Sequence, residues 1–135
     1  MGSKHLDHKV QVLVVEDSDI NRLMLVKQLR FIGCNAVAVN NGQQAVEYCQ
    51  NHSVDMILMD CLMPVLDGYQ ATTIIRQHSS RRSYDTPVII GLTACAMVGD
   101  RQKCLAAGMN DYLAKPAFVK DLKAVLYKWS QPVAV

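Results

Sequence analysis

Five short apolar runs, separated by segments with helical spacing, limit what this chain of 135 residues can fold into. The runs are rich in β-branched and aliphatic residues and cover residues 10–15, 36–39, 56–59, 88–92 and 112–114. Short runs that are apolar at successive positions are typical of parallel strands with helices over both faces. We therefore expect an α/β domain built on a parallel sheet of five strands.

The segments between the runs show where several helices begin or end. The first helix ends before Gly33, and the fourth spans residues 98–107 and stops at Gly108, since glycine readily closes a helix. The third begins after Asp67, which pairs with Gln70 in a variant of the capping box. The last helix carries an apolar stripe that consists of Phe118, Leu122, Val125, Leu126 and Trp129.

Consecutive strand–helix units favour a doubly wound sheet with right-handed crossovers and the strand order 2-1-3-4-5. In this order the topology switches direction between strands 1 and 3, and ligands bind at the carboxyl ends of those strands. We expect one domain over residues 10–130. Residues 1–9 are expected to be a disordered lead-in, or a linker or tag remnant, and residues 131–135 a short tail.

The composition argues against several classes of protein. Fourteen Lys and Arg residues stand against twelve Asp and Glu residues, and this net charge of +2 predicts no direct nucleic-acid partner. No apolar run approaches the roughly 18 residues that span a bilayer, which predicts no direct membrane contact from this domain. The five cysteines form no C-x-x-C pair, so we interpret them as small core residues in a reducing compartment.

Polar residues follow four of the apolar runs, at the point where each strand is expected to end. Glu16 and Asp17 follow the first run, Asp60 the third, Thr93 the fourth and Lys115 the fifth. The carboxyl ends of parallel strands meet at one edge of the sheet, so these side chains are expected to converge there. Carboxylates brought together repel one another unless a cation lies among them, and oxygen ligands of this kind suit Mg²⁺.

An aspartate beside a metal ion and a lysine can act as the nucleophile in phosphoryl transfer, since carboxylates form acyl phosphates. Asp60 is the best-placed candidate, because it follows the central strand between the acidic pair and Lys115. Plainer interpretations remain open at this point. Glu16 and Asp17 could cap the first helix, although Ser18 and Asp19 could do so equally well, and Asp60 could be an ordinary turn residue.

Taken together, the motifs resemble those of the response-regulator receiver domains of two-component signalling. They are E-D at 16–17, D-x-x-M-P-x-x-D-G at 60–68, L-T-A at 92–94 and D-Y-L-A-K-P at 111–116. The resemblance extends over nearly the whole chain, from about Val10 to Trp129. It implies the flavodoxin-like receiver fold and a two-state switch that phosphorylation biases.

Asp60 corresponds to the phosphorylation site of this family. The resemblance implies that Asp17 and Asp60 bind Mg²⁺ directly, that the backbone carbonyl of Leu62 is a further ligand, and that Glu16 acts through water. The side chain of Leu62 departs from the family pattern, because many members carry a polar group there that can approach the attacking water. We therefore expect Leu62 to slow the loss of the phosphoryl group.

The resemblance also assigns residues to the conformational switch. Thr93 and Lys115 are expected to contact the phosphoryl group, and Tyr112 is expected to turn inward once Thr93 has moved. The peptide bond between Lys115 and Pro116 is expected to be cis. Cys95 lies in the same region, two residues after Thr93, and the sequence does not say in which direction it acts.

The residues around the motifs, over 60–72 and 92–116, resemble receivers that are fused to hybrid sensor histidine kinases. This implies two partners, a histidine kinase domain and a histidine-phosphotransfer domain. It also implies a cytoplasmic receiver, whether or not the parent is an inner-membrane sensor kinase. The receiver would phosphorylate and dephosphorylate itself only in a limited sense, so histidine kinase activity would belong to the parent protein.

Three other interpretations are possible for a chain with this pattern. A stand-alone regulator would bind a target protein when phosphorylated, and a degenerate receiver would serve as a scaffold without carrying phosphate. The intact set of Asp17, Asp60, Thr93 and Lys115 argues against the degenerate receiver. A flavin-binding protein of similar topology would need a phosphate-binding loop after the first strand, where the acidic segment 16–22 would repel phosphate.

Overall fold

Strands and helices alternate along the chain in the computed structural model of the protein, which describes residues 9–79, 86–94 and 98–130. The strands are β1 (Gln11–Val15), β2 (Asn35–Val39), β3 (Met56–Asp60), β4 (Val88–Thr93) and β5 (Asp111–Ala114). The helices are α2 (Asp19–Ile32), α3 (Gly42–Asn51), α4 (Gly68–Ser79), α5 (Val98–Ala107) and α6 (Val119–Ser130). Each strand lies within one residue of its predicted bounds.

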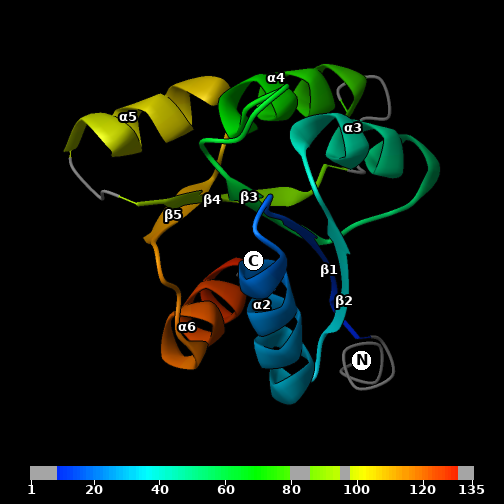
Figure 1. Ribbon diagram of the computed structural model, residues 1–135, viewed down its shortest axis with the longest axis vertical. Helices are drawn as coiled ribbons and strands as arrows, with labels where there is room; N and C mark the ends of the chain where they lie inside the picture. The colour runs from blue at the N-terminus through cyan, green and yellow to red at the C-terminus, as the bar shows by residue number, and fades with distance from the viewer. Residues whose placement is uncertain (1–8, 80–85, 95–97, 131–135) are drawn as a thin grey trace, which may run out of the picture.

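The five strands pair in parallel in the order β2-β1-β3-β4-β5, which confirms the predicted topology. Helices α3, α4 and α5 cover one face of the sheet, and α2 and α6 cover the other (Figure 1). All five residues of the central strand β3 are buried, whereas the edge strands β2 and β5 are partly exposed. The chain therefore has the doubly wound α/β fold that was expected.

The core consists of two apolar clusters, one on each face of the sheet. Successive residues of a strand point to opposite faces, so each central strand contributes to both clusters. In β3, for example, Leu58 packs on the face covered by α2 and α6, and Met59 packs on the face covered by α3, α4 and α5. The apolar residues of the central strands therefore form the core on both faces of the sheet, and the polar residues lie at the carboxyl ends of the strands.

The helix ends follow the signals in the sequence. Gly33 and Gly108 both have φ of 108°, a left-handed conformation that favours glycine. The predicted capping box forms at the start of α4: Gln70 N donates to Asp67 Oδ1 at 2.8 Å, and Asp67 N donates to Gln70 Oε1 at 3.1 Å. These local interactions place the start of α4 directly after the loop that follows β3.

The inward stripe of α6 is shorter than predicted. Phe118 was expected to belong to it, but this side chain is 56% exposed and α6 begins at Val119. Phe118 occupies the N-cap position, because its carbonyl accepts a hydrogen bond from Leu122 N at 3.0 Å. Its side chain therefore leaves the helix before the apolar face begins. The other members of the stripe pack against the core as expected: Leu122, Val125, Leu126 and Trp129.

Some sequence predictions fall on residues outside those described. They concern the lead-in apart from Lys9, the tail, and Cys95. The cysteines within the described ranges are free, and three of them, Cys34, Cys61 and Cys104, are buried, in agreement with a packing role. Within those ranges, no helix combines the length and the apolarity that crossing a bilayer requires.

Asp111, the first residue of β5, joins this edge strand to α6. Its Oδ2 accepts hydrogen bonds from Trp129 Nε1 at 3.0 Å and Lys128 Nζ at 3.1 Å, and its Oδ1 accepts one from Tyr112 N at 2.9 Å. Burial by itself raises the pKa of Asp111, but these hydrogen bonds and the charge of Lys128 outweigh it and hold the pKa below its ordinary value. The contact anchors β5, and β5 in turn positions Lys115.

We expect Asp111→Asn to lower the free energy of unfolding by about 1 kcal/mol at pH 7, because an amide cannot replace the charge-assisted hydrogen bonds. Since the folded-state pKa is lowered, this stabilisation is complete above the unfolded-state pKa of about 4 and is lost as the pH falls through the folded-state value. Urea unfolding of both proteins at pH 7 and pH 3 measures the effect. A difference as large at pH 3 as at pH 7 would contradict the prediction.

Candidate functional site

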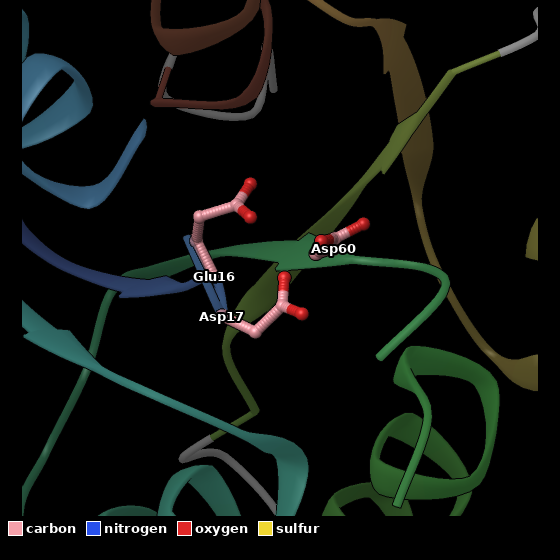
Figure 2. Close-up of side chains that lie close together, drawn as sticks. All are labelled: Glu16, Asp17 and Asp60. Atoms are coloured by element: carbon pink, nitrogen blue, oxygen red, sulfur yellow. The ribbon is translucent and has the colours of Figure 1, made fainter. Parts of the chain in front are cut away.

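The carboxyl ends of the strands bring the predicted side chains together at one edge of the sheet. Glu16 and Asp17 follow β1 and Asp60 ends the neighbouring β3, and each offers a carboxylate oxygen within 4.8 Å of the others (Figure 2). Lys115 follows β5, and its Nζ lies 3.1 Å from Asp60 Oδ2 and 3.3 Å from Glu16 Oε1. The predicted convergence of these four residues is confirmed.

The sheet register explains this convergence. Glu16 N donates to Val39 O at 3.2 Å, so the backbone of β1 keeps its pairing up to the first carboxylate. Thr93 follows Leu92, the residue of β4 that pairs with Asp60. Its carbonyl accepts a hydrogen bond from Lys115 N at 2.7 Å, and its side chain is buried. Thr93 therefore lies between the strand that carries Asp60 and the residue that supplies the ammonium group.

Burial separates the three carboxylates into two kinds. Glu16 and Asp60 are only 1% and 3% exposed, whereas Asp17 is exposed. Burial raises the pKa of Glu16, and the charge of Asp60 adds to this rise, while the hydrogen bond from Ser18 N and the charge of Lys115 oppose it. Burial by itself lowers the pKa of Lys115, but the two carboxylates raise it above its ordinary value and keep the ammonium charged.

The donor set fits a hard divalent cation. Three carboxylates lie together with one ammonium group, which leaves excess negative charge when all three are ionised. Glu16 Oε1 is buried and, within the described residues, receives no hydrogen bond of good geometry, although Lys115 Nζ is near it. Carboxylate oxygens of this kind bind Mg²⁺ directly or through its bound water. Asp17, Asp60 and Glu16 are the residues that could hold such an ion.

The short link between β1 and α2 shows which residue caps this helix. Ser18 is the N-cap of α2, since its Oγ accepts a hydrogen bond from Asn21 N at 3.3 Å. The interpretation of Glu16 and Asp17 as helix caps is therefore wrong. Arg22, to which the sequence assigned no role in the site, donates from Nη1 to the Glu16 carbonyl at 2.8 Å.

The loop from β3 to α4 returns close to the backbone of Asp60. Gly68 N donates to Cys61 O at 3.0 Å, and a Cβ on Gly68 would lie 2.2 Å from the Asp60 carbonyl oxygen. Gly68 therefore allows a close backbone approach as well as starting the helix. Leu62 is in this loop; its side chain is 73% exposed and its N lies 3.4 Å from Asp60 Oδ1. Its predicted effect on phosphate lifetime remains a prediction.

The remaining predicted features lie on the β5 side of the site. The peptide bond between Lys115 and Pro116 is cis, as expected. Tyr112 pairs with Gly91 while Ala114 pairs with Thr93, so Tyr112 and Thr93 point to the same face of the sheet. Tyr112 is partly buried against the core cluster of that face. This arrangement is compatible with the switch role, which stays a prediction.

Glu16 and Lys115 also border a cavity of about 280 Å³ on the face covered by α2 and α6. Its walls are mostly apolar, and the other lining residues are Asn21, Met24, Leu25, Gln28, Leu92, Pro116 and Ala117. The acidic cluster therefore has a recess beside it that is lined by the first three turns of α2 and by the segment after β5.

Comparison with known proteins points to one family. The family model for the response regulator receiver domain matches residues 12–127. Among solved structures, the chain is similar to the receiver domain of sensor histidine kinase PA1611 from Pseudomonas aeruginosa, with 45% identity and a TM-score of 0.79 over 90% of this chain and 98% of that one. That structure has a magnesium ion coordinated in its active-site cleft.

Two further similarities are to a receiver domain in a complex and to a sensor protein. One is a structure of the Saccharomyces cerevisiae histidine phosphotransfer protein Ypd1 with the receiver domain of Ssk1, at 34% identity and a TM-score of 0.85 over 90% of this chain and 88% of that one. The other is the sensor protein GacS of Pseudomonas syringae, 39% identical over 89% of this chain. The chain spans only 13% of the length of GacS.

We expect Asp17→Asn to raise the melting temperature by a few degrees when no divalent cation is present. The substitution removes one of three neighbouring negative charges, and it leaves the contacts of Lys115 with Asp60 and Glu16 in place. Added Mg²⁺ should stabilise the parent protein and have a much smaller effect on the variant. Thermal unfolding in EDTA and in Mg²⁺ measures both effects.

Glu47→Gln is the matched control, because it removes an exposed carboxylate from α3, away from the cluster. This variant should keep the response of the parent to Mg²⁺. Equal stabilisation of Asp17→Asn and the parent by Mg²⁺ would show that Asp17 is not part of a metal site.

Proposed function

The chain belongs to the response regulator receiver domain family, and we propose that Asp60 accepts a phosphoryl group from a phosphohistidine in a reaction that depends on Mg²⁺. The observation that carries this proposal is the environment of the Asp60 carboxylate. It is buried, it lies 3.1 Å from the Lys115 ammonium, and two further carboxylates lie within 4.8 Å. A buried aspartate held among a cation and metal-type ligands is suited to act as a nucleophile toward phosphorus.

The proposed step exchanges one bond for another. An oxygen of Asp60 forms a bond to phosphorus, the bond between phosphorus and the histidine nitrogen breaks, and that nitrogen leaves with the electron pair and takes up a proton. Lys115 stays charged, as its raised pKa requires, and offers hydrogen bonds to the oxygens of the transferred group. Hydrolysis of the aspartyl phosphate later returns Asp60 to its free form.

Asp17, Asp60 and the backbone carbonyl of Leu62 would hold Mg²⁺ directly, and Glu16 would do so through water. The ion would neutralise negative charge on the phosphoryl oxygens as the group is transferred. The raised pKa of Glu16 is consistent with this role, because a buried carboxylate without enough positive charge nearby is costly to ionise. The chain's own contribution is to hold these oxygens in place and to keep Lys115 beside Asp60.

The signal follows from the charge that Asp60 gains. A phosphoryl group adds negative charge and acceptor oxygens, which would attract the hydroxyl of Thr93 and the ammonium of Lys115. Movement of Thr93 would open space on its face of the sheet, and Tyr112 could turn into that space. Such a change alters the surface formed by α5, β5 and α6, so a partner that binds this surface could distinguish the two states.

We propose that the parent protein is a hybrid histidine kinase. The chain spans 4% of the length of the hybrid signal transduction histidine kinase G of Dictyostelium discoideum and 13% of GacS, so in both similar proteins the matching segment is a small part of the whole. The partners would be a histidine kinase domain and a histidine-phosphotransfer domain. This proposal also implies a cytoplasmic location for the receiver, since its phosphoryl group would come from histidine kinases that use ATP.

The docking surface for these partners would be the start of α2 together with the loops around the acidic cluster. Large apolar side chains are exposed there, which is typical of a surface that a partner covers. They are Ile20, Leu23, Met24, Leu62, Val65 and Phe118. A helical phosphotransfer domain that packs on this surface would bring its phosphohistidine to Asp60.

Incubation with Mg²⁺ and acetyl phosphate tests the central proposal. We expect the intact mass of the parent to rise by one phosphoryl group, and Asp60→Asn to abolish this rise. Asp55→Asn is the matched control, because Asp55 precedes β3 at the opposite edge of the sheet. This control should be phosphorylated like the parent. Absence of a phosphoryl adduct on the parent would refute the proposed function.

The exposed side chain of Leu62 gives a second prediction. Leu62→Asn should shorten the half-life of the aspartyl phosphate several-fold, because an amide next to Asp60 can hydrogen-bond the attacking water and leucine cannot. Dephosphorylation followed by intact mass after removal of acetyl phosphate measures the half-life. Val65→Asn, an exposed position in the same loop, should leave it unchanged. A half-life of Leu62→Asn equal to or longer than that of the parent would contradict the prediction.

A further inference from the structure

Arg22 on α2 makes two contacts, one with the backbone of the acidic cluster and one within its own helix. Its Nη1 donates to the Glu16 carbonyl at 2.8 Å, and its Nη2 forms an ion pair with Asp19. The Arg22 side chain is only 16% exposed, which is low for an arginine on the outer layer of a small domain. The guanidinium group therefore joins the first turn of α2 to the peptide bond between Glu16 and Asp17.

This peptide bond links two carboxylates of the proposed metal site. It lies in a short connection, because β1 ends at Val15 and Ser18 is already the N-cap of α2. On the side of Glu16 the connection is held by Glu16 N, which donates to Val39 O at 3.2 Å, and by Ser18 N, which donates to Glu16 Oε2 at 3.2 Å. A rotation about the backbone bonds that flank this peptide would change the direction of one side chain relative to the other and so move the two carboxylates.

The contact with Arg22 restrains that rotation from the carbonyl side. A charge-assisted hydrogen bond at 2.8 Å, made by a guanidinium whose other arm is held by Asp19, fixes the carbonyl in direction as well as in distance. Groups that orient metal ligands in this indirect way affect metal affinity although they never touch the ion.

The positive charge of Arg22 has the opposite effect on the binding of a metal ion. A positive charge close to the cluster weakens the attraction of a divalent cation, so its removal should by itself strengthen Mg²⁺ binding. The ion pair with Asp19 balances this charge locally and reduces its effect at the metal site. If the restraint on the Glu16 carbonyl outweighs the remaining effect of the charge, loss of Arg22 weakens the binding of a divalent cation.

We propose that Arg22 is a positioning residue for the metal-binding carboxylates, and this inference rests on the proposed function of the site. The inference predicts a change in Mg²⁺ affinity opposite to the change that loss of the charge alone would produce. Loss of the positive charge at Arg22 weakens the binding of a divalent cation instead of strengthening it.

The test is the dissociation constant for Mg²⁺, measured by isothermal titration calorimetry at fixed ionic strength for the parent and three variants. We expect Arg22→Gln to raise it roughly tenfold, the usual size of an effect on ligand orientation. Arg22→Lys keeps the charge but cannot make both contacts, and should lie between the parent and Arg22→Gln. Arg30→Gln is the matched control, since Arg30 Nη2 donates to the Ala36 carbonyl at 3.3 Å on β2, away from the cluster.

Arg30→Gln should bind Mg²⁺ as the parent does. An unchanged or lower dissociation constant for Arg22→Gln would overturn the inference, and so would an equal rise for Arg30→Gln. The titrations are made below the melting temperature of every variant, and if Arg22→Gln does not fold, a dissociation constant of Arg22→Lys equal to that of the parent would overturn the inference. A parent that takes up no Mg²⁺ would instead refute the proposed metal site, and the inference with it.

Discussion

The contact of the Lys115 ammonium with Asp60 and Glu16 is the interaction on which the rest of the site depends. Two buried carboxylates, Glu16 and Asp60, lie close to a third one, and carboxylates held this close repel one another unless a positive charge lies among them. Lys115 supplies that charge at 3.1 Å and 3.3 Å. It reaches them only because β5 pairs with β4 and because the backbone N–H of Lys115 bonds to Thr93 at the end of that strand. The chemistry at this edge therefore requires the complete sheet.

Residues at the opposite edge hold the strands that carry the site. Arg76 on α4 donates to Gly108 O at 2.7 Å, Pro87 O at 2.6 Å and Asn110 Oδ1 at 2.6 Å, and so ties α4 to the segments that precede β4 and β5. Asp111 ties the start of β5 to α6. These contacts fix the amino ends of strands whose carboxyl ends present Thr93 and Lys115. The placement extends along the strands from their amino ends to their carboxyl ends, since packed strands do not slide freely past one another.

Sequence patterns predicted the elements well where the signal is local. The buried run of β3 and the capping box of Asp67 and Gln70 act over a few residues, and the structure agrees with both. Phe118 was placed wrongly because it continues the apolar period of α6 by one residue beyond the point where the helix begins. Arg22 and Arg76 were not assigned their roles, because most of their partners are backbone carbonyls. Every residue has a carbonyl, so such a partner leaves no trace in the pattern of residue types.

By itself the sequence determined the five strand–helix units, their order in the sheet and the chemical groups at the strand ends, since periodicity and chain order suffice for these. Only the tertiary structure decided how those groups differ from one another. It buries Glu16 and exposes Asp17, although the two are adjacent, and it makes Ser18 the helix cap. It also sets Lys115 against both Glu16 and Asp60. Burial and charge pairing depend on distances between strands that are remote along the chain, and those distances exist only once the sheet has formed.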